Sequence, residues 1–145
     1  MQFVPIPTSR KPISKDDPRD FLDATFDQWF PFLEGISRRS KEPVNNLLKQ
    51  IADRDVQLAL AWDGDRPLAL FGIRFVKRGD DLIGEVCWLT GRQVKRWLCL
   101  LPQLEQYLRD MGCKEIRPIC RPGWARLILN KSGYKATHYQ MEKVL

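Results

Sequence analysis

The chain has 145 residues, of which 43% are hydrophobic and 29% are charged, and its net charge is +6. These proportions are typical of a globular protein and exclude collagen, coiled coil and a wholly disordered chain. No apolar run approaches the roughly 18 residues of a membrane span, and residues 1–10 lack an apolar signal-peptide core, so we expect one cytoplasmic domain over residues 1–145.

Two helices are expected after a short first strand. Gln2 to Ile6 alternates weakly, and its prolines confine that strand to a sheet edge. The segment Asp16-Asp17-Pro18 starts a helix, and Pro31 should kink or split it. Its apolar face consists of Leu22, Phe26, Trp29 and Leu33. Residues 40–43 open a second helix that ends before Asp53, with an inner face of Val44, Leu47, Leu48 and Ile51.

The pattern then changes to strands. Val56–Trp62 and Pro67–Val76 flank the turn residues 63–65, which predicts a hairpin. A polar turn at residues 77–81 leads into a third strand, Leu82–Leu89.

The remainder returns to helix and strand in alternation. Gln93–Met111 is a long amphipathic helix that Pro102 should bend and Gly112 should end. There follow a short strand over 113–120, a helix from Pro122 that Gly133 ends, and a last strand over 134–144. Hairpins make neighbouring strands antiparallel and crossover helices make them parallel, so the order β-α-α-β-β-β-α-β-α-β predicts an α/β (α+β) fold with one mixed, twisted sheet.

The charge and the cysteines are unevenly placed. Residues 1–80 hold 13 basic and 12 acidic side chains, whereas residues 81–145 hold 11 and 6. A basic half favours an anionic partner, and the alternative is that the charge only keeps the chain soluble. The four cysteines contain no C-x-x-C pair, and His138 is the single histidine. We therefore expect reduced, mostly buried thiols and no metal site.

The element order resembles that of the GCN5-related N-acetyltransferase (GNAT) fold over nearly the whole chain, and residue similarity is confined to the C-terminal third. Ala125, Gly133 and Tyr134 stand at the family's spacing of an alanine and, eight and nine residues later, a glycine-aromatic pair. The alanine lets the helix pack closely, the glycine ends it and the aromatic residue starts the last strand. These residues support the fold and not the chemistry.

The resemblance also assigns a cofactor position. In GNAT proteins the strand corresponding to Leu82–Leu89 splays from its neighbour, acetyl-CoA lies in the gap, and a glycine loop binds the pyrophosphate. That loop corresponds to residues 90–97, where Gln93, Lys95 and Trp97 stand near the positions of the family's glycines. The candidate cofactor residues are Gly91, Arg92, Gln93, Lys95 and Arg96. The three cations among them hold phosphates by charge or form a solvated helix face.

The proton-transfer positions differ from the family pattern. Leu129 stands where the resemblance implies a tyrosine acid, and Pro122 stands where it implies an asparagine. Neither side chain can transfer a proton. Glu85 is the candidate catalytic base for an amine, and the alternative is a glutamate paired with a cation across the sheet.

Three functions follow from these observations. The first is a GNAT-fold protein that has lost acetyl-CoA chemistry, needs no cofactor and binds a partner protein, with Trp88 and Trp97 filling the cleft or forming a partner surface. A likeness of residues 87–133 to internal virion proteins of short-tailed phages implies an assembly role, in the host cytoplasm or the virion. The second is an acyl-CoA-dependent N-acetyltransferase with a nonstandard site. The third is nucleic-acid binding through Arg92, Lys95, Arg96, Arg117, Arg121 and Arg126.

Overall fold

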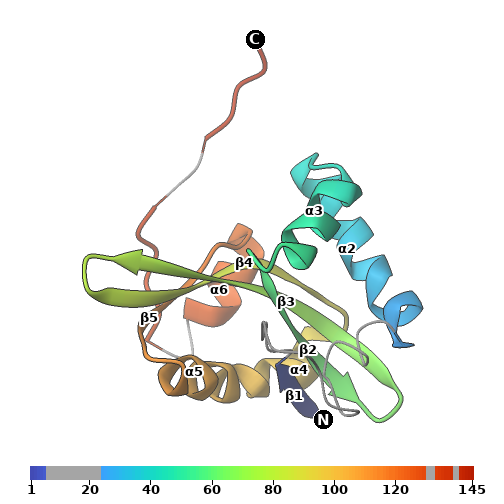
Figure 1. Ribbon diagram of the computed structural model, residues 1–145, viewed down its shortest axis with the longest axis horizontal. Helices are drawn as coiled ribbons and strands as arrows, with labels where there is room; N and C mark the ends of the chain where they lie inside the picture. Colours follow the sequence, from blue (N-terminus) through green and yellow to red (C-terminus); the bar gives the residue numbers. More distant parts are fainter. Residues whose placement is uncertain (6–23, 130–132, 139–140) are drawn as a thin grey trace.

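The computed structural model forms one mixed sheet with helices on both faces (Figure 1). It describes residues 1–5, 24–129, 133–138 and 141–145. The strand order is β1-β2-β3-β4-β5, with antiparallel pairing from β1 to β4 and parallel pairing of β4 with β5. The strands are β1 (Gln2–Pro5), β2 (Gln57–Asp63), β3 (Arg66–Arg78), β4 (Asp81–Gly91) and β5 (Cys113–Pro118). The mixed α/β architecture is as predicted.

Two tight turns produce the antiparallel centre of the sheet. Asp63 pairs with Arg66 across the first turn, where Gly64 has a φ of 62°. The second turn joins β3 to β4 and contains Gly79 with a φ of 64°. Glycine adopts this left-handed backbone without steric cost, which is why both polar turns were recognisable in the sequence.

The helices divide between the two faces. The pair α2 (Phe26–Ser40) and α3 (Val44–Ala52) covers one face, and the helical crossover between β4 and β5 covers the other (Figure 1). That crossover consists of α4 (Val94–Trp97), the 3-10 helix η1 (Leu98–Leu100) and α5 (Leu101–Asp110), and α6 (Pro122–Leu129) follows β5. Within the described residues, no helix is long and apolar enough to cross a membrane.

Alternation along β2 supplies both cores. Leu58 and Leu60 face α2 and α3, whereas Ala59 and Ala61 face α5. The first core also contains Leu33, Leu47 and Trp88, and the second contains Phe71, Ile73, Leu104 and Leu108. A β-bulge at Cys87 shifts the alternation of β4, because Gly72 pairs with Trp88 whereas Ile73 pairs with Val86.

The structure tests two expectations about prolines. The predicted helix Gln93–Met111 is broken, because Pro102 lacks an N–H and its ring would clash with the carbonyl of Leu98, so a new helix, α5, begins with Pro102 in its first turn. In contrast, α2 continues across Pro31, so the helix is not split there, and the kink stays a prediction. The burial of Trp29, Phe32, Leu33 and Ile36 on the sheet outweighs the roughly 3 kcal/mol that an interior proline costs. The predicted start at residues 16–18 lies outside the described residues.

The predicted last strand, residues 134–144, is also wrong in the parts that the structure describes. Residues 133–138 and 141–145 have no strand pairing. Tyr134 is partly buried and its hydroxyl donates to a Glu105 carboxylate oxygen on α5 at 2.9 Å. The residues from Lys135 to His138 are exposed, so they present no apolar face that would hold them on β5.

Gly72 gives a test of the packing beside the bulge. A Cβ on Gly72 would lie 2.6–2.9 Å from three atoms of Trp88, one of them its Cβ. We expect Gly72→Ala to lower the free energy of unfolding by about 1–3 kcal/mol, measured by urea denaturation. The matched control is Gly123→Ala in α6, where a Cβ meets nothing within 4 Å. Equal stability of the two variants would contradict the close contact.

Candidate functional site

The candidate site lies where β4 and β5 part. Their pairing runs from Leu82 with Cys113 to Val86 with Pro118, and the N–H of Ile119 then donates to the Val86 carbonyl at 2.9 Å. β4 continues to Gly91, so residues 87–91 have no β5 partner. β5 ends at Pro118, which still pairs with Val86, and the predicted splaying of β4 from its neighbour stays a prediction.

The indole of Trp97 occupies the space beside the unpaired end of β4. Its Nε1 would lie 2.8 Å from a Cβ built on Gly91, and its ring makes an edge contact with Phe71 at 5.5 Å. On the other side, Trp124 of α6 lies against it with ring centroids 5.3 Å apart. Trp97 is 0% exposed and packs between the end of β4 and Trp124 of α6.

Among the described residues, the fully buried Nε1 of Trp97 has no hydrogen-bond acceptor. A buried donor without a partner costs about 1–3 kcal/mol. The indole is therefore held in place by its apolar contacts, which must offset that cost.

The predicted phosphate loop makes contacts of its own within the chain. The N–H of Arg92 donates to the Leu68 carbonyl at 2.7 Å. The Arg96 guanidinium pairs with the Asp63 carboxylate at 2.6 Å and donates to the Gln93 side chain at 3.0 Å. Gln93 itself has a φ of 52° and precedes α4, whose first turn has no side-chain cap. Gly91, Arg92, Gln93, Lys95 and Arg96 thus lie together, but Arg96 is already ion-paired.

Four arginines lie on the α2 side of the same strand end, and we call them the arginine strip: Arg38, Arg39, Arg92 and Arg121. The Arg39 Nη2 donates to the Thr90 hydroxyl at 3.0 Å, and the Arg92 guanidinium lies over the Phe32 ring, 5.6 Å from its centroid. Burial lowers the pKa of Arg39, and the neighbouring charges of Arg121 and Arg38 lower it further. The strip is thus a concentration of positive charge.

Glu85, the candidate base, forms an ion pair. Its carboxylate lies 3.3 Å from Arg74 on β3, and its side chain is 15% exposed. The same guanidinium donates to the Gln50 side chain at 3.1 Å. A hollow of about 450 Å³ lies beside Arg74, between the end of α3 and strands β2 and β3. The arrangement is the cross-sheet pair that the sequence allows as the alternative, and a catalytic role for Glu85 stays a prediction.

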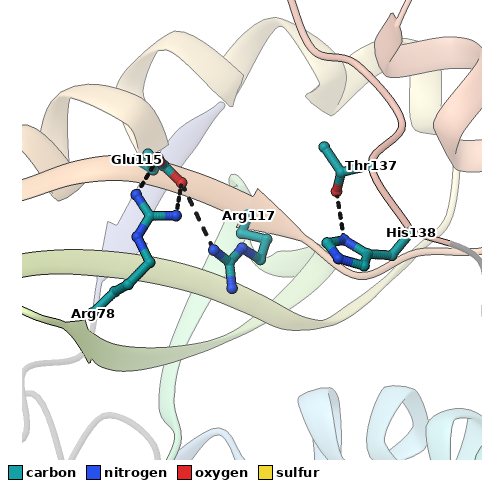
Figure 2. A network of polar contacts seen from close by, with 5 residues as sticks. All are labelled: Arg78, Glu115, Arg117, Thr137 and His138. Atoms are coloured by element: carbon teal, nitrogen blue, oxygen red, sulfur yellow. Dashed lines mark hydrogen bonds and ion pairs between the residues drawn. The ribbon is translucent and has the colours of Figure 1, made fainter.

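The other basic residues do not form one continuous unpaired face. Arg117 lies 3.8 Å from Glu115, which also binds Arg78 of β3 (Figure 2). With Arg96 bound to Asp63, two of the six cations proposed for nucleic-acid binding form ion pairs, and Arg117 shares its carboxylate with Arg78. Pro122 begins α6 as predicted, and the side chain of Leu129 lies outside the described atoms.

The thiols differ in accessibility. Cys99 is exposed, so the expectation of mostly buried cysteines is wrong for it, whereas Cys87, Cys113 and Cys120 are partly buried. Burial raises the pKa of the Cys87 thiol to about 11. Within the described ranges, no three His, Cys, Asp or Glu side chains gather into a metal-binding group.

Arg38, Arg39 and Trp124 were absent from the candidate residues. Basic residues in the last turn of a helix are ordinary partners of its dipole, so the two arginines gave no separate signal. A usable signal was the seven-residue spacing of Phe32 and Arg39, which places both on one face of α2.

Comparison with known proteins identifies the fold. No family model matches the chain, and no curated protein does. A solved structure described as a probable acetyltransferase is 14% identical, with a TM-score of 0.65 over 100% of this chain and 97% of its own. A ribosomal-protein-alanine N-acetyltransferase from Brucella melitensis biovar Abortus 2308 is 12% identical, with a TM-score of 0.63 over 84% of this chain and 92% of its own. A glucosamine-6-phosphate N-acetyltransferase from Arabidopsis thaliana is 15% identical, with a TM-score of 0.59 over 83% of this chain and 92% of its own. The chain therefore has the GNAT fold.

The two indoles in the gap should differ in their contribution to stability. We expect Trp97→Ala to lower the free energy of unfolding by about 3–5 kcal/mol, because it leaves a large internal cavity. Trp124→Ala should cost roughly 1–2 kcal/mol, because that side chain is already partly exposed. Urea denaturation followed by circular dichroism measures both, and similar costs would show that Trp97 is not the buried member of the pair.

The raised pKa of Cys87 predicts slow alkylation. The thiolate is the reactive form, so at pH 8 about one Cys87 in a thousand is reactive, and its rate should rise about tenfold per pH unit up to about pH 11. Iodoacetamide at pH 8 should therefore label Cys99 first, as read by peptide mass spectrometry. The control is the chain in urea, where the two sites should react alike. Equal labelling in the folded state at pH 8 would contradict the burial of Cys87.

Proposed function

We propose that this protein uses the GNAT fold as a binding scaffold and does not transfer acyl groups from acetyl-CoA. The observation that carries this proposal is the indole of Trp97, which lies between the unpaired end of β4 and Trp124 of α6. In enzymes of this fold the cofactor lies in the gap between the strands that correspond to β4 and β5. We infer that acetyl-CoA and the Trp97 side chain compete for the space beside the unpaired end of β4, so the residues present do not fit the cofactor.

The energies support the same conclusion. Moving the Trp97 side chain out of its packing forfeits about 3–5 kcal/mol, the range measured for removing a large buried aromatic group. Each 1.4 kcal/mol weakens binding tenfold, so a micromolar affinity would become about millimolar. The loop adds little to offset this, because the Arg92 N–H and the Arg96 guanidinium already have partners.

The binding role includes the assembly function that the phage likeness implies, with a partner protein in the cytoplasm or in a virion. The second candidate is an active N-acetyltransferase, in which acetyl-CoA would be the acyl donor. It is favoured by the parting of β4 from β5 after Val86 and by the position of Glu85 one residue earlier. The names of the similar solved structures, which are acetyltransferases, fit this second candidate equally well.

Calorimetric titration with acetyl-CoA separates the two candidates. We expect no saturable heat for the wild-type chain up to about 1 mM acetyl-CoA, because the gap is filled. An active enzyme of the same fold, titrated in the same buffer, is the positive control. Saturable binding below 1 mM, with release of the coenzyme A thiol when an amine is added, would contradict the proposal. It would show that the Trp97 side chain leaves room for the cofactor and that the protein is an enzyme.

A further inference from the structure

The arginine strip is the feature that the scaffold proposal leaves unexplained. Among the described residues, no ion pair joins Arg38, Arg39, Arg92 or Arg121 to a carboxylate. Elsewhere several arginines pair with carboxylates, as in Arg74 with Glu85, Arg78 with Glu115 and Arg96 with Asp63. Arg54, Arg66 and Arg126 also lack an ion pair among the described residues, so the strip is distinguished by the closeness of its arginines to one another.

Two of its guanidinium groups are held by neutral partners. Arg39 is held by the Thr90 hydroxyl, and Arg92 by the face of the Phe32 ring. These contacts restrict the side chains and leave most of their N–H groups for another acceptor. A guanidinium held in this way loses less side-chain entropy when it binds a carboxylate.

The dimensions of the strip limit its ligand. The guanidinium groups of Arg38 and Arg39 both fold back toward Gly35, 3.9 and 3.4 Å from a Cβ built there, and that of Arg92 lies over Phe32. Gly35 and Phe32 are three residues apart on α2, which is about 4.5 Å along the helix axis. An extended peptide advances about 3.3 Å per residue, so two or three consecutive residues span that distance.

We propose that the arginine strip binds a short acidic segment of a partner protein, with consecutive glutamate or aspartate carboxylates accepting hydrogen bonds from the arginines. The inference rests on the scaffold function and names the chemistry of its partner. It explains why the strip lacks carboxylates of its own in the described part of the chain: the partner supplies them.

Nucleic acid fits the strip less well. A protein that contacts about six to ten phosphates along a nucleic-acid backbone needs a longer track of cations than one turn of α2 provides. Single-stranded binding also uses exposed aromatic rings for stacking. In the part of the chain that is described, the exposed large apolar residues include no aromatic side chain.

Fluorescence anisotropy with a fluorescein-labelled peptide containing four consecutive glutamates tests the proposal. The matched probe replaces the four glutamates by glutamines, and unlabelled octathymidine and inorganic pyrophosphate serve as competitors. We expect the glutamate peptide to bind at least tenfold more tightly than the glutamine peptide, with affinity falling as NaCl is raised. Equal affinity of the two peptides overturns the proposal, as does octathymidine binding more tightly than the glutamate peptide.

Variants locate the binding on the protein. Arg39→Gln and Arg92→Gln should each weaken the glutamate peptide about fivefold or more, because each removes a charge-assisted bond. Arg39→Lys keeps the positive charge but cannot donate two parallel hydrogen bonds to one carboxylate. Its affinity for the glutamate peptide should therefore lie between those of the wild type and Arg39→Gln. The control is Arg66→Gln, an exposed arginine of the β2-β3 turn, which should change affinity less than twofold. A thermal melt verifies that each variant is folded, and equal loss in the Arg66 control overturns the assignment to the strip.

The acetyl-CoA titration keeps the two proposals separate. If acetyl-CoA binds and the glutamate peptide still requires Arg39 and Arg92, the scaffold proposal fails and the acidic-segment site stands. If neither acetyl-CoA nor the peptide binds, the scaffold proposal stands and the acidic-segment site is overturned.

Discussion

The contact between Trp97 and the end of β4 holds together the elements around the candidate site. Gly91 leaves room for the indole, since any Cβ there would meet Trp97, Ala69 and the Leu68 carbonyl at 2.8 Å. Trp124 packs against this indole, and the contact joins α6 to the crossover helices. One apolar contact therefore links β4, α4 and α6 at the end of β4, five residues beyond its last pair with β5, and the indole nitrogen has no hydrogen-bond partner among the described residues.

The polar surroundings follow from the same geometry. Because β4 continues five residues past its last β5 pair, Thr90 reaches the end of α2 and meets Arg39. The bulge at Cys87 sets which face Trp88 and Thr90 occupy, and both face α2 as a result. A strand that ended with β5 would bring neither Thr90 nor Arg92 to α2, and the arginine strip would not form. The separation of the strands and the concentration of charge are thus two results of one long β4.

Periodicity and turn residues were sufficient to predict the sheet and most helices. Alternation in β2 and glycine at positions 64 and 79 specify the hairpins locally, and a helical crossover makes β5 parallel to β4. The site was harder, because its contacts join distant segments: Arg39 and Thr90 are 51 residues apart in the chain. The broken crossover helix and the missing last strand depend on local competition, between Pro102 and the helix ladder in one case and between exposure and pairing in the other.

A buried side chain such as Trp97 stabilises the fold at all times, whereas a ligand stabilises it only while bound. A ligand present at about 100 times its dissociation constant stabilises a protein by about 2.7 kcal/mol, and only while it is bound. A buried indole contributes roughly 3–5 kcal/mol at all times, judged from the cost of removing one. In the scaffold that we propose, Trp97 supplies stability that an enzyme of this fold would gain only from its bound cofactor. The residue proposed to exclude acetyl-CoA would then also keep the fold stable in its absence.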